Sequence, residues 1–277
     1  MKSLSSLLIT SALIAASTTA SAALVAGDIA LVGFQANGSP SDSFSFATLV
    51  NVDAGTVLYF TDNGFTTTTG SGATAGFRGV LSTDNDGNEG LIKYTVGANG
   101  LAAGQVVSSL STNTANGAWT STGLIYGTTS GSGSYAPLAF ANRAAEQFTV
   151  FTSTNAQPML SGYTALYNFD TTGAYEAATD TGTGQLAPGL VQGTSAVLTN
   201  NILTSFQNFN FAAFSGPADR ATWLARIGNA ANWTFAGTSA VPVATNVADG
   251  SFSVGAVPSP GAVALLGLAG LVARRRR

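Results

Sequence analysis

The sequence predicts an all-β protein: an antiparallel, β-sandwich-like body with one short helix at about residues 217–229, preceded by a signal helix and followed by a hydrophobic helix. Three observations support this prediction. Short runs of β-branched and aromatic residues alternate with turn-forming residues along most of the chain. Hydrophobic residues make up 45% of the 277 residues, which is ample for a core. Charged residues make up only 8%, and this polar but uncharged composition suits an extracellular β-protein better than a cytosolic enzyme.

The predicted strands are short and are separated by polar turns. Residues 55–61 illustrate the pattern, because this β-branched and aromatic run leads directly into Asp62-Asn63-Gly64, a strong turn signal. Around ten such strands favour a sandwich or a related all-β packing. The other predicted strands are 25–34, 43–50, 91–96, 105–110, 147–152, 163–169, 195–199, 206–211, 233–236 and 251–254.

One stretch, 217–229, departs from the strand pattern. Pro217 occupies a suitable first helical position, Asp219 lies in the first turn and Gly228 lies near the end. We therefore predict a single helix packed on the sheet, with core rather than ligand-binding residues on its buried face. Helical spacing puts three apolar residues on that face: Trp223, Leu224 and Ile227.

The chain contains neither cysteine nor histidine. Without cysteine, disulfide bonds, thiol nucleophiles and cysteine metal sites are excluded. Without histidine, the side chain most often used as a general base near neutral pH, and the commonest metal ligand, is missing. Ser–His–Asp hydrolysis, zinc proteolysis and blue-copper chemistry therefore each lose a required group.

The formal net charge of −3 conceals a more acidic body. Five of the ten basic residues lie at the termini, at Lys2 and 274–277, so the body sets five basic residues against all 13 acidic ones. Such a body lacks the basic surface that phosphate contacts require. Nucleic acid is therefore not an expected partner.

Residues 1–22 have the three parts of a secretory signal peptide. Lys2 gives the positive start, residues 7–16 form a short apolar stretch, and Ala20 and Ala22 are the small residues that signal peptidase needs. A buried core helix would also be apolar, but the small-residue site directly after the apolar run favours a signal peptide. We predict cleavage after Ala22.

The last 21 residues also have three parts. The turn-forming Pro258-Ser259-Pro260 precedes an apolar run over 261–273, and the chain closes with four arginines. As a helix, the 13 apolar residues span about 20 Å, whereas a bilayer core is about 30 Å thick. Arginine stems can snorkel across part of this difference, and the basic end is expected to stay cytoplasmic with the body outside. The basic end consists of Arg274, Arg275, Arg276 and Arg277.

This tail resembles the PEP-CTERM sorting signal of exosortase substrates. In that family a Pro-Glu-Pro motif precedes a hydrophobic helix and a basic end, and Pro258 and Pro260 match the two prolines, while Ser259 stands in place of the glutamate. The resemblance, over 257–277, implies processing by exosortase, an envelope or extracellular location with a transient membrane tether, and exopolysaccharide as a neighbour. A plain membrane anchor is the alternative, and the shortness of the apolar run argues against it.

We expect one extracellular domain over 23–240 and a spacer over 241–256 between the two terminal signals. The domain resembles a body domain of other exported bacterial envelope proteins, which is itself similar to a lamin-tail-type β-sandwich. The residues that carry this resemblance begin AGDIALVGFQANGSPSDSFSFATLVNVDAGTVLYFTDNGF. It supports the all-β prediction and implies no catalytic residue.

Glycine-, serine- and threonine-rich stretches at 70–76, 113–117 and 127–133 predict exposed loops. A further turn, at residues 84–89, is the best metal candidate, because it alternates oxygen ligands around a glycine as calcium sites do. Its ligands would be Asp84, Asp86 and Asn88, with Glu89 a weaker candidate. The alternative is an exposed acidic turn, because the turn lacks the EF-hand spacing.

Three functions remain open for the body. The first is a non-enzymatic envelope or matrix protein associated with exopolysaccharide. The second is a carbohydrate-binding or adhesive module, in which the aromatic residues nearest the predicted loops stack on sugar rings; these are Trp119, Tyr126 and Tyr135. The third is a polysaccharide hydrolase using two carboxylates about 5–10 Å apart. Its candidate acids are Asp62, Glu89, Glu146, Asp170, Glu176 and Asp180.

Overall fold

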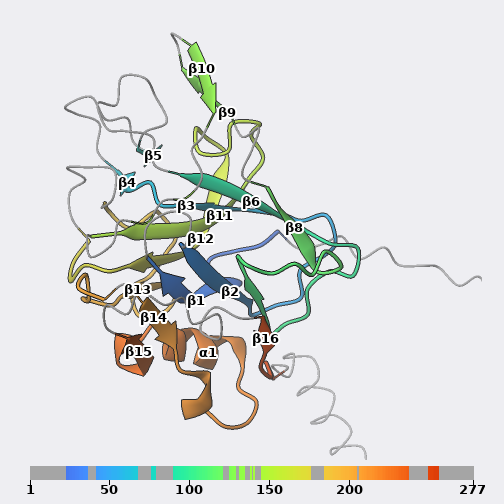
Figure 1. Ribbon diagram of the computed structural model, residues 1–277, viewed down its shortest axis with the longest axis vertical. Helices are drawn as coiled ribbons and strands as arrows, with labels where there is room; N and C mark the ends of the chain where they lie inside the picture. Colours follow the sequence, from blue (N-terminus) through green and yellow to red (C-terminus); the bar gives the residue numbers. More distant parts are fainter. Residues whose placement is uncertain are drawn as a thin grey trace, which may run out of the picture.

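Two facing β-sheets form the body of the protein in a computed structural model of the chain (Figure 1). The structure describes residues 23–36, 42–67, 76–78, 90–120, 125–128, 131–134, 138, 140, 145–175, 184–204, 206–236 and 249–255. The two predicted terminal helices lie outside these residues.

Each sheet has six strands in the described part of the chain. The first sheet has the spatial order β15 (Trp233–Ala236), β14 (Phe206–Phe209), β1 (Ile29–Gln35), β2 (Ser43–Thr48), β7 (Gln105–Ser108) and β16 (Gly250–Ser251). The second has the order β13 (Ala196–Leu198), β12 (Tyr163–Asp170), β11 (Gln147–Ser153), β3 (Val57–Thr61), β6 (Leu91–Val96) and β8 (Gly117–Thr120). Two small hairpins are β4 (Phe65–Thr66) with β5 (Gly76–Phe77), and β9 (Ile125–Thr128) with β10 (Gly131–Ser134).

The all-β prediction is confirmed, and the predicted strand segments each overlap an observed strand. The neighbouring strands within the two large sheets pair antiparallel, apart from β12 with β13, which pair parallel. Antiparallel pairing fits short strands joined by polar turns, because tight turns reverse the chain without a helical crossover.

Aromatic side chains fill the space between the two sheets. The alternation of serine and phenylalanine in β2 points Phe44 and Phe46 to the same inner face. The Phe44 ring lies 4.7 Å from Phe148 of β11 and 4.9 Å from Phe60 of β3, between ring centroids, and Phe46 lies 5.3 Å from Phe60. Such tilted and edge-on pairs each add about 0.5–1.5 kcal/mol beyond the area they bury. This inter-sheet contact is the main core of the domain.

A second hydrophobic cluster covers the outer face of the second sheet. Phe151 of β11 projects to this face, where it packs with Phe65 and Phe77 of the β4–β5 hairpin. Met159, Ala187 and Leu190 complete the cover from neighbouring loops. Strand β3 contacts both clusters, Leu58 and Phe60 on one face and Tyr59 on the other, which accounts for its continuous apolar run over 57–60.

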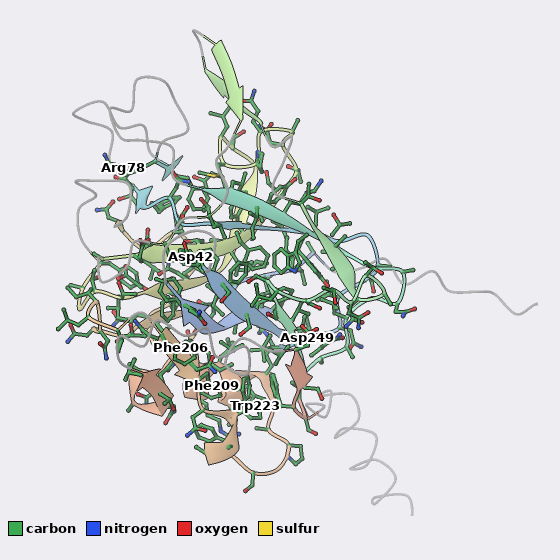
Figure 2. All side chains as sticks on the ribbon, viewed as in Figure 1. Asp42, Arg78, Phe206, Phe209, Trp223 and Asp249 are labelled. Atoms are coloured by element: carbon green, nitrogen blue, oxygen red, sulfur yellow. The ribbon has the colours of Figure 1, made fainter. Side chains whose placement is uncertain are left out.

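The predicted helix is confirmed as α1 (Arg220–Ile227), with short 3₁₀ turns η1 (Phe211–Ala213) and η2 (Ala230–Asn232) on either side. Asp219 is the N-cap, since its side chain accepts a 2.7 Å hydrogen bond from the Thr222 amide, and Gly228 is the C-cap. Figure 2 shows the buried Trp223 of α1 close to Phe209 of β14. The predicted apolar face of Trp223, Leu224 and Ile227 is therefore correct.

Helix α1 also holds the beginning of the described chain. The Arg220 guanidinium donates to the Ala26 carbonyl at 2.7 Å and lies 2.9 Å from the Asp28 carboxylate. Leu224 packs over Gly27, where φ is +81° and where a Cβ would lie 2.6 Å from a Leu224 methyl carbon. Gly27 thus meets two requirements at once: left-handed backbone and close approach of the helix.

Part of the expected spacer over 241–256 packs on the domain. Residues 249–255, hereafter the C-terminal segment, belong to the domain: β16 pairs with β7, and Val254 bridges Ala218. The Phe252 ring packs 4.5 Å from Trp223, whose indole N–H donates to the Ser253 carbonyl at 3.0 Å. A large aromatic partner on α1 explains why so short a strand stays attached.

Two loop expectations also need correction. Residues 127–133 lie largely in the β9–β10 hairpin rather than in an open loop, and Gly117 opens strand β8 rather than closing a loop. Gly117 is required there, because the Tyr94 ring passes directly over the position that a Cβ would occupy. The same glycines that suggested loops therefore permit close packing of strands.

If the C-terminal segment is part of the domain, Phe252→Ala lowers the free energy of unfolding by about 2 kcal/mol, because it removes a partly buried ring from Trp223 and Phe211. Urea denaturation measures this change. Leu203→Ala is the control: Leu203 is 70% exposed, so its truncation shifts stability by less than about 0.5 kcal/mol. Equal effects of the two substitutions would restore the spacer interpretation.

Candidate functional site

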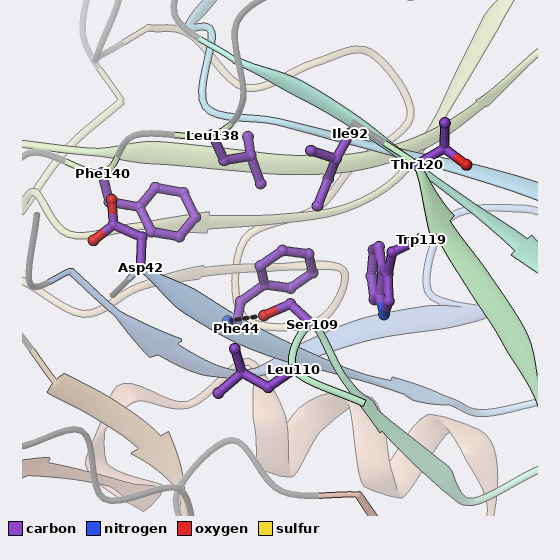
Figure 3. Close-up of a pocket in the computed structure, with 9 residues that line it drawn as sticks. All are labelled: Asp42, Phe44, Ile92, Ser109, Leu110, Trp119, Thr120, Leu138 and Phe140. Atoms are coloured by element: carbon purple, nitrogen blue, oxygen red, sulfur yellow. Dashed lines mark hydrogen bonds between the residues drawn. The ribbon is translucent and has the colours of Figure 1, made fainter. Parts of the chain in front are cut away.

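A cavity of about 230 Å³ opens between the two sheets beside strand β8. In Figure 3 the lining residue Phe44 lies between Trp119 on one side and Asp42 and Phe140 on the other. Six of the nine residues that line the cavity are apolar, and three of these six are aromatic. The lining residues are Asp42, Phe44, Ile92, Ser109, Leu110, Trp119, Thr120, Leu138 and Phe140.

Strand β2 and the turn after β7 form the first wall of the cavity. Two hydrogen bonds join them: the Phe44 amide donates to Ser109 Oγ at 3.0 Å, and the Ser109 amide donates to the Phe44 carbonyl at 2.8 Å. They continue the β2–β7 ladder, in which Ser45 pairs with Ser108, by one residue. Ser109 and Leu110 are thereby held at the cavity rather than in a free loop.

Trp119 of β8 forms the opposite wall and is fixed by contacts around its ring. Its indole N–H donates to the Ser108 carbonyl at 3.1 Å. Its ring centroid lies 4.7 Å from Tyr94 and 5.3 Å from both Phe44 and Phe60. The side chain is therefore half-buried and rigid, with the remaining ring surface lining the cavity.

The C-terminal segment secures the turn that carries Ser109. One Asp249 oxygen accepts a 2.8 Å hydrogen bond from the Ser108 amide, and the other accepts a 2.5 Å bond from Ser111 Oγ. Because Ser108 also bonds the Trp119 indole through its carbonyl, this one residue connects Asp249 to both walls of the cavity. The four residues 108–111 thus depend on a partner 138 or more positions away in the sequence.

Tyr94 lies behind Trp119, and its environment favours the neutral phenol. Burial raises its pKa to about 12, and the negative charge of Asp249 contributes to the same shift. Burial also raises the pKa of Tyr59 and Tyr163. The Tyr94 phenol behind Trp119 therefore stays uncharged throughout the physiological range, as do Tyr59 and Tyr163 on the outer face of the second sheet.

The chemistry of the lining suits a ligand with both apolar and hydroxyl-bearing surfaces. Trp119 offers part of its half-buried ring, the almost fully buried Phe44 and Phe140 pack behind it, and Ser109 offers a hydroxyl group. Two other cavities share residues 51–53 in their linings, and neither is lined by an aromatic side chain. The Trp119 cavity is therefore the better candidate for a binding site.

Of the three aromatic residues predicted to stack on sugar rings, only Trp119 has a described side chain. Trp119 was expected to be exposed beside a loop, and instead it lies on a strand with much of its ring in the core, because β8 pairs with β6. Tyr126 lies on β9, of which only the backbone is described, and Tyr135 lies outside the described residues. Asp42, Phe44, Ser109 and Asp249 were not predicted as site residues.

Three of the predicted acids are buried, at Asp62, Glu146 and Asp170. Asp62 Oδ1 accepts a 2.6 Å bond from the Gly90 amide, and Asp170 Oδ1 accepts bonds from the amide and hydroxyl of Thr172 at 2.7 and 2.6 Å. These acids line neither the Trp119 cavity nor the two cavities at residues 51–53. Glu89, Glu176 and Asp180 lie outside the described residues.

The candidate calcium ligands Asp84, Asp86 and Asn88 also lie outside the described residues, as do the signal-cleavage and sorting residues. Within the part of the chain that the structure covers, no three acidic side chains gather closely enough to hold a metal ion. In that same part, no helix is both long and apolar enough to cross a bilayer.

The fold and the cavity together define an all-β domain with an aromatic-lined cavity at the open side of its two sheets. Comparison with protein-family models, with curated proteins and with solved structures finds no match to this chain. Evidence on its function therefore comes from its own residues.

Tyr94 makes the protein sensitive to alkaline pH. Between pH 10 and about 12 the folded state keeps a phenol proton that the unfolded chain releases, so the free energy of unfolding falls as the pH rises through this window. Denaturant titrations at pH 9 and at pH 11 measure the loss, and Tyr94→Phe makes it smaller without abolishing it, because other buried tyrosines contribute. If the free energy of unfolding falls as much in Tyr94→Phe as in the wild type, Tyr94 is not a source of the alkaline sensitivity.

Asp249 is expected to protect the Ser108 amide. Asp249→Ala removes its acceptor, so hydrogen exchange at Ser108 accelerates about fivefold, the effect of losing one hydrogen bond worth about 1 kcal/mol. Exchange followed by NMR measures the change, with Asp53→Ala, another exposed acid, as the control. Equal protection in both variants would show that residues 108–111 are held without the C-terminal segment.

Proposed function

We propose that this chain is an exported, non-enzymatic protein of the cell envelope or extracellular matrix, sorted by exosortase and associated with exopolysaccharide. One observation carries the proposal: a signal-peptide pattern at 1–22 and a PEP-CTERM-like tail at 257–277 flank the body. Signal peptidase and exosortase are then its processing partners, and the membrane holds it only in transit.

The positions of the two processing sites support this proposal. The described hydrogen bonds begin with the Val25 amide, which donates to Asp28 Oδ2, and end with the Gly255 amide, which donates to the Ala218 carbonyl. Cleavage after Ala22 and near 258–260 leaves every one of these contacts in place. The domain is thus compatible with removal of both terminal segments.

The non-enzymatic assignment rests on composition and on the buried acids. The chain has no histidine and no cysteine. Asp62 and Asp170 bond backbone amides of the turns beside them, a structural use of a carboxylate. A carboxylate hydrolase needs two acids that share a cleft with the substrate, and the acids at 62, 146 and 170 do not line the cavities described above.

The Trp119 cavity favours a second candidate function, a carbohydrate-binding module. A fixed indole beside oxygen-bearing side chains is an arrangement that stacks on the apolar face of a sugar ring and bonds its hydroxyls. This candidate is compatible with the first, because a matrix protein is retained by such contacts.

The intact mass of the protein recovered from its native host tests the sorting proposal. We expect the mature chain to begin at Ala23 and to end near 258–260, with the four arginines removed. Ser259→Glu restores the usual motif and is expected to be processed at least as completely. Replacing Arg274–Arg277 with glutamine, as the matched variant, is expected to leave the tail on the protein.

A wild-type mass that retains the four arginines in both envelope and medium fractions would contradict exosortase processing. Release of sugars from envelope polysaccharide by the purified protein, lost on changing one acidic residue, would contradict the non-enzymatic assignment.

A further inference from the structure

We propose that an apolar patch beside α1 lies on the membrane surface while the C-terminal tail tethers the protein, and that this patch is a second membrane contact. The inference rests on the proposed tether and deepens it, because it names the face of the domain that meets the lipid. The patch, hereafter the α1 patch, consists of five partly exposed apolar side chains: Phe211, Phe214, Ala218, Phe252 and Val254.

The aromatic members of the α1 patch share one buried base, the Trp223 ring. This ring is only 2% exposed and lies 4.5 Å from Phe252, between ring centroids. It lies 6.2 Å from both Phe211 and Phe214. Phe211 and Phe252 are 5.0 Å apart, although the first belongs to η1 and the second to the C-terminal segment. Figure 1 shows α1 and β16 at the same end of the domain, so these rings form one surface there.

The described chain leaves the domain at this patch. Val254 bridges Ala218, and the Gly255 amide donates to the Ala218 carbonyl at 2.7 Å. Only residues 256–260 separate Gly255 from the apolar run of the tail, so the six steps to Gly261 span at most about 22 Å. A folded domain of this size is about 45 Å across. Because the tether is shorter than the domain is wide, the face at Ala218 stays turned toward the bilayer.

The two segments that build the α1 patch carry no charge. Neither 211–218 (FAAFSGPA) nor 250–257 (GSFSVGAV) contains an acidic or basic residue. The charged side chains that follow the first segment have partners in the domain: Asp219 caps α1, and Arg220 pairs with Asp28. A contiguous exposed apolar patch is typical of surfaces that contact protein or lipid. The position of the tail selects lipid as the partner.

Arg226 lies at the edge of the α1 patch and suits the headgroup region. Its guanidinium carbon lies 4.7 Å over the Phe214 ring and 4.8 Å over the Trp223 ring. An arginine stem can lie along apolar surface while its cationic end meets a lipid phosphate. Asp219 at the other end of the helix carries the opposite charge, so we expect contact with the bilayer to depend on apolar surface more than on lipid charge.

The shortness of the tail gives the second contact its purpose. The 13 apolar residues of the tail reach across about 20 Å of a bilayer core about 30 Å thick. Membrane anchors that are marginal alone hold stably when two act together. The α1 patch is connected to the tail by so few residues that its own contact is intramolecular and therefore favoured by a high effective concentration.

The test uses the chain over 23–277, which retains the tail, in vesicles of phosphatidylcholine and phosphatidylglycerol. The chain has no cysteine, so a single introduced cysteine carries one fluorescent label. Ala213→Cys labels an exposed position beside Phe214, and Leu160→Cys labels a 41% exposed position next to the second hydrophobic cluster, across the domain. We expect quenchers in the lipid to quench the label at 213 about threefold more than the label at 160. This difference persists in about 1 M salt, where charge attraction is screened.

A matched pair of charge variants shows whether the patch itself makes the contact. Ala212 is exposed, so Ala212→Glu adds a charge to the patch without removing a core side chain. It is expected to lower quenching at 213 to the value measured at 160, because a carboxylate resists leaving water. Leu160→Glu adds the same charge on the far side and leaves quenching at 213 unchanged.

Flotation of the vesicles separates this inference from the proposed tether. Protein that floats with the vesicles while the labels at 213 and 160 are quenched equally overturns the α1 contact and keeps the tether. Protein that does not float overturns both. Quenching at 213 that Ala212→Glu leaves unchanged overturns the contact at this patch. A label at 213 that becomes shielded without lipid, as protein concentration rises, shows that a second copy covers the patch instead and also overturns the inference.

Discussion

The aromatic contact between the two sheets determines both the stability of this domain and the shape of its cavity. Phe44 belongs to both: its ring packs against Phe60 and Phe148 in the core and lines the cavity beside Trp119. Aromatic rings packed on several sides do not reorient independently. The cavity is therefore a continuation of the core to the edge of the sheets, and a ligand there meets a surface that the fold has already fixed.

Scarcity of charge is the second constraint, and it connects the fold to the proposed environment. With 8% charged residues, the side chains that bond the backbone outside the sheet ladders are largely hydroxyls and amides with a few carboxylates, as at Thr48, Gln147 and Asp249. None of the nine described residues that line the cavity is basic. A domain of this kind is suited to contact with uncharged, hydroxyl-rich polymers, since such contacts depend on shape and hydrogen bonds more than on ion pairs.

Much of the fold was predictable from sequence, because strand periodicity and turn residues are local signals. The Ser-Phe-Ser-Phe run of β2 and the apolar spacing of α1 gave correct inner faces. The site was largely not predictable, because it depends on distant partners: Asp249 bonds Ser108 across 141 positions, and the half-buried Trp119 lies on a strand whose Gly117 lets it pass beneath Tyr94. The glycine-rich segments predicted loops where the structure has strands, since glycine marks close packing as well as loops.

The most direct test of the central claim uses the three tryptophans of the chain as reporters. Trp119 lines the cavity, whereas Trp223 on α1 and Trp233 on β15 are only 2% and 5% exposed. The measurement is the NMR shift of each indole N–H on adding the host's own exopolysaccharide, digested to short fragments. The account predicts a shift confined to the Trp119 indole. Unchanged indoles, or equal shifts of all three, would contradict it.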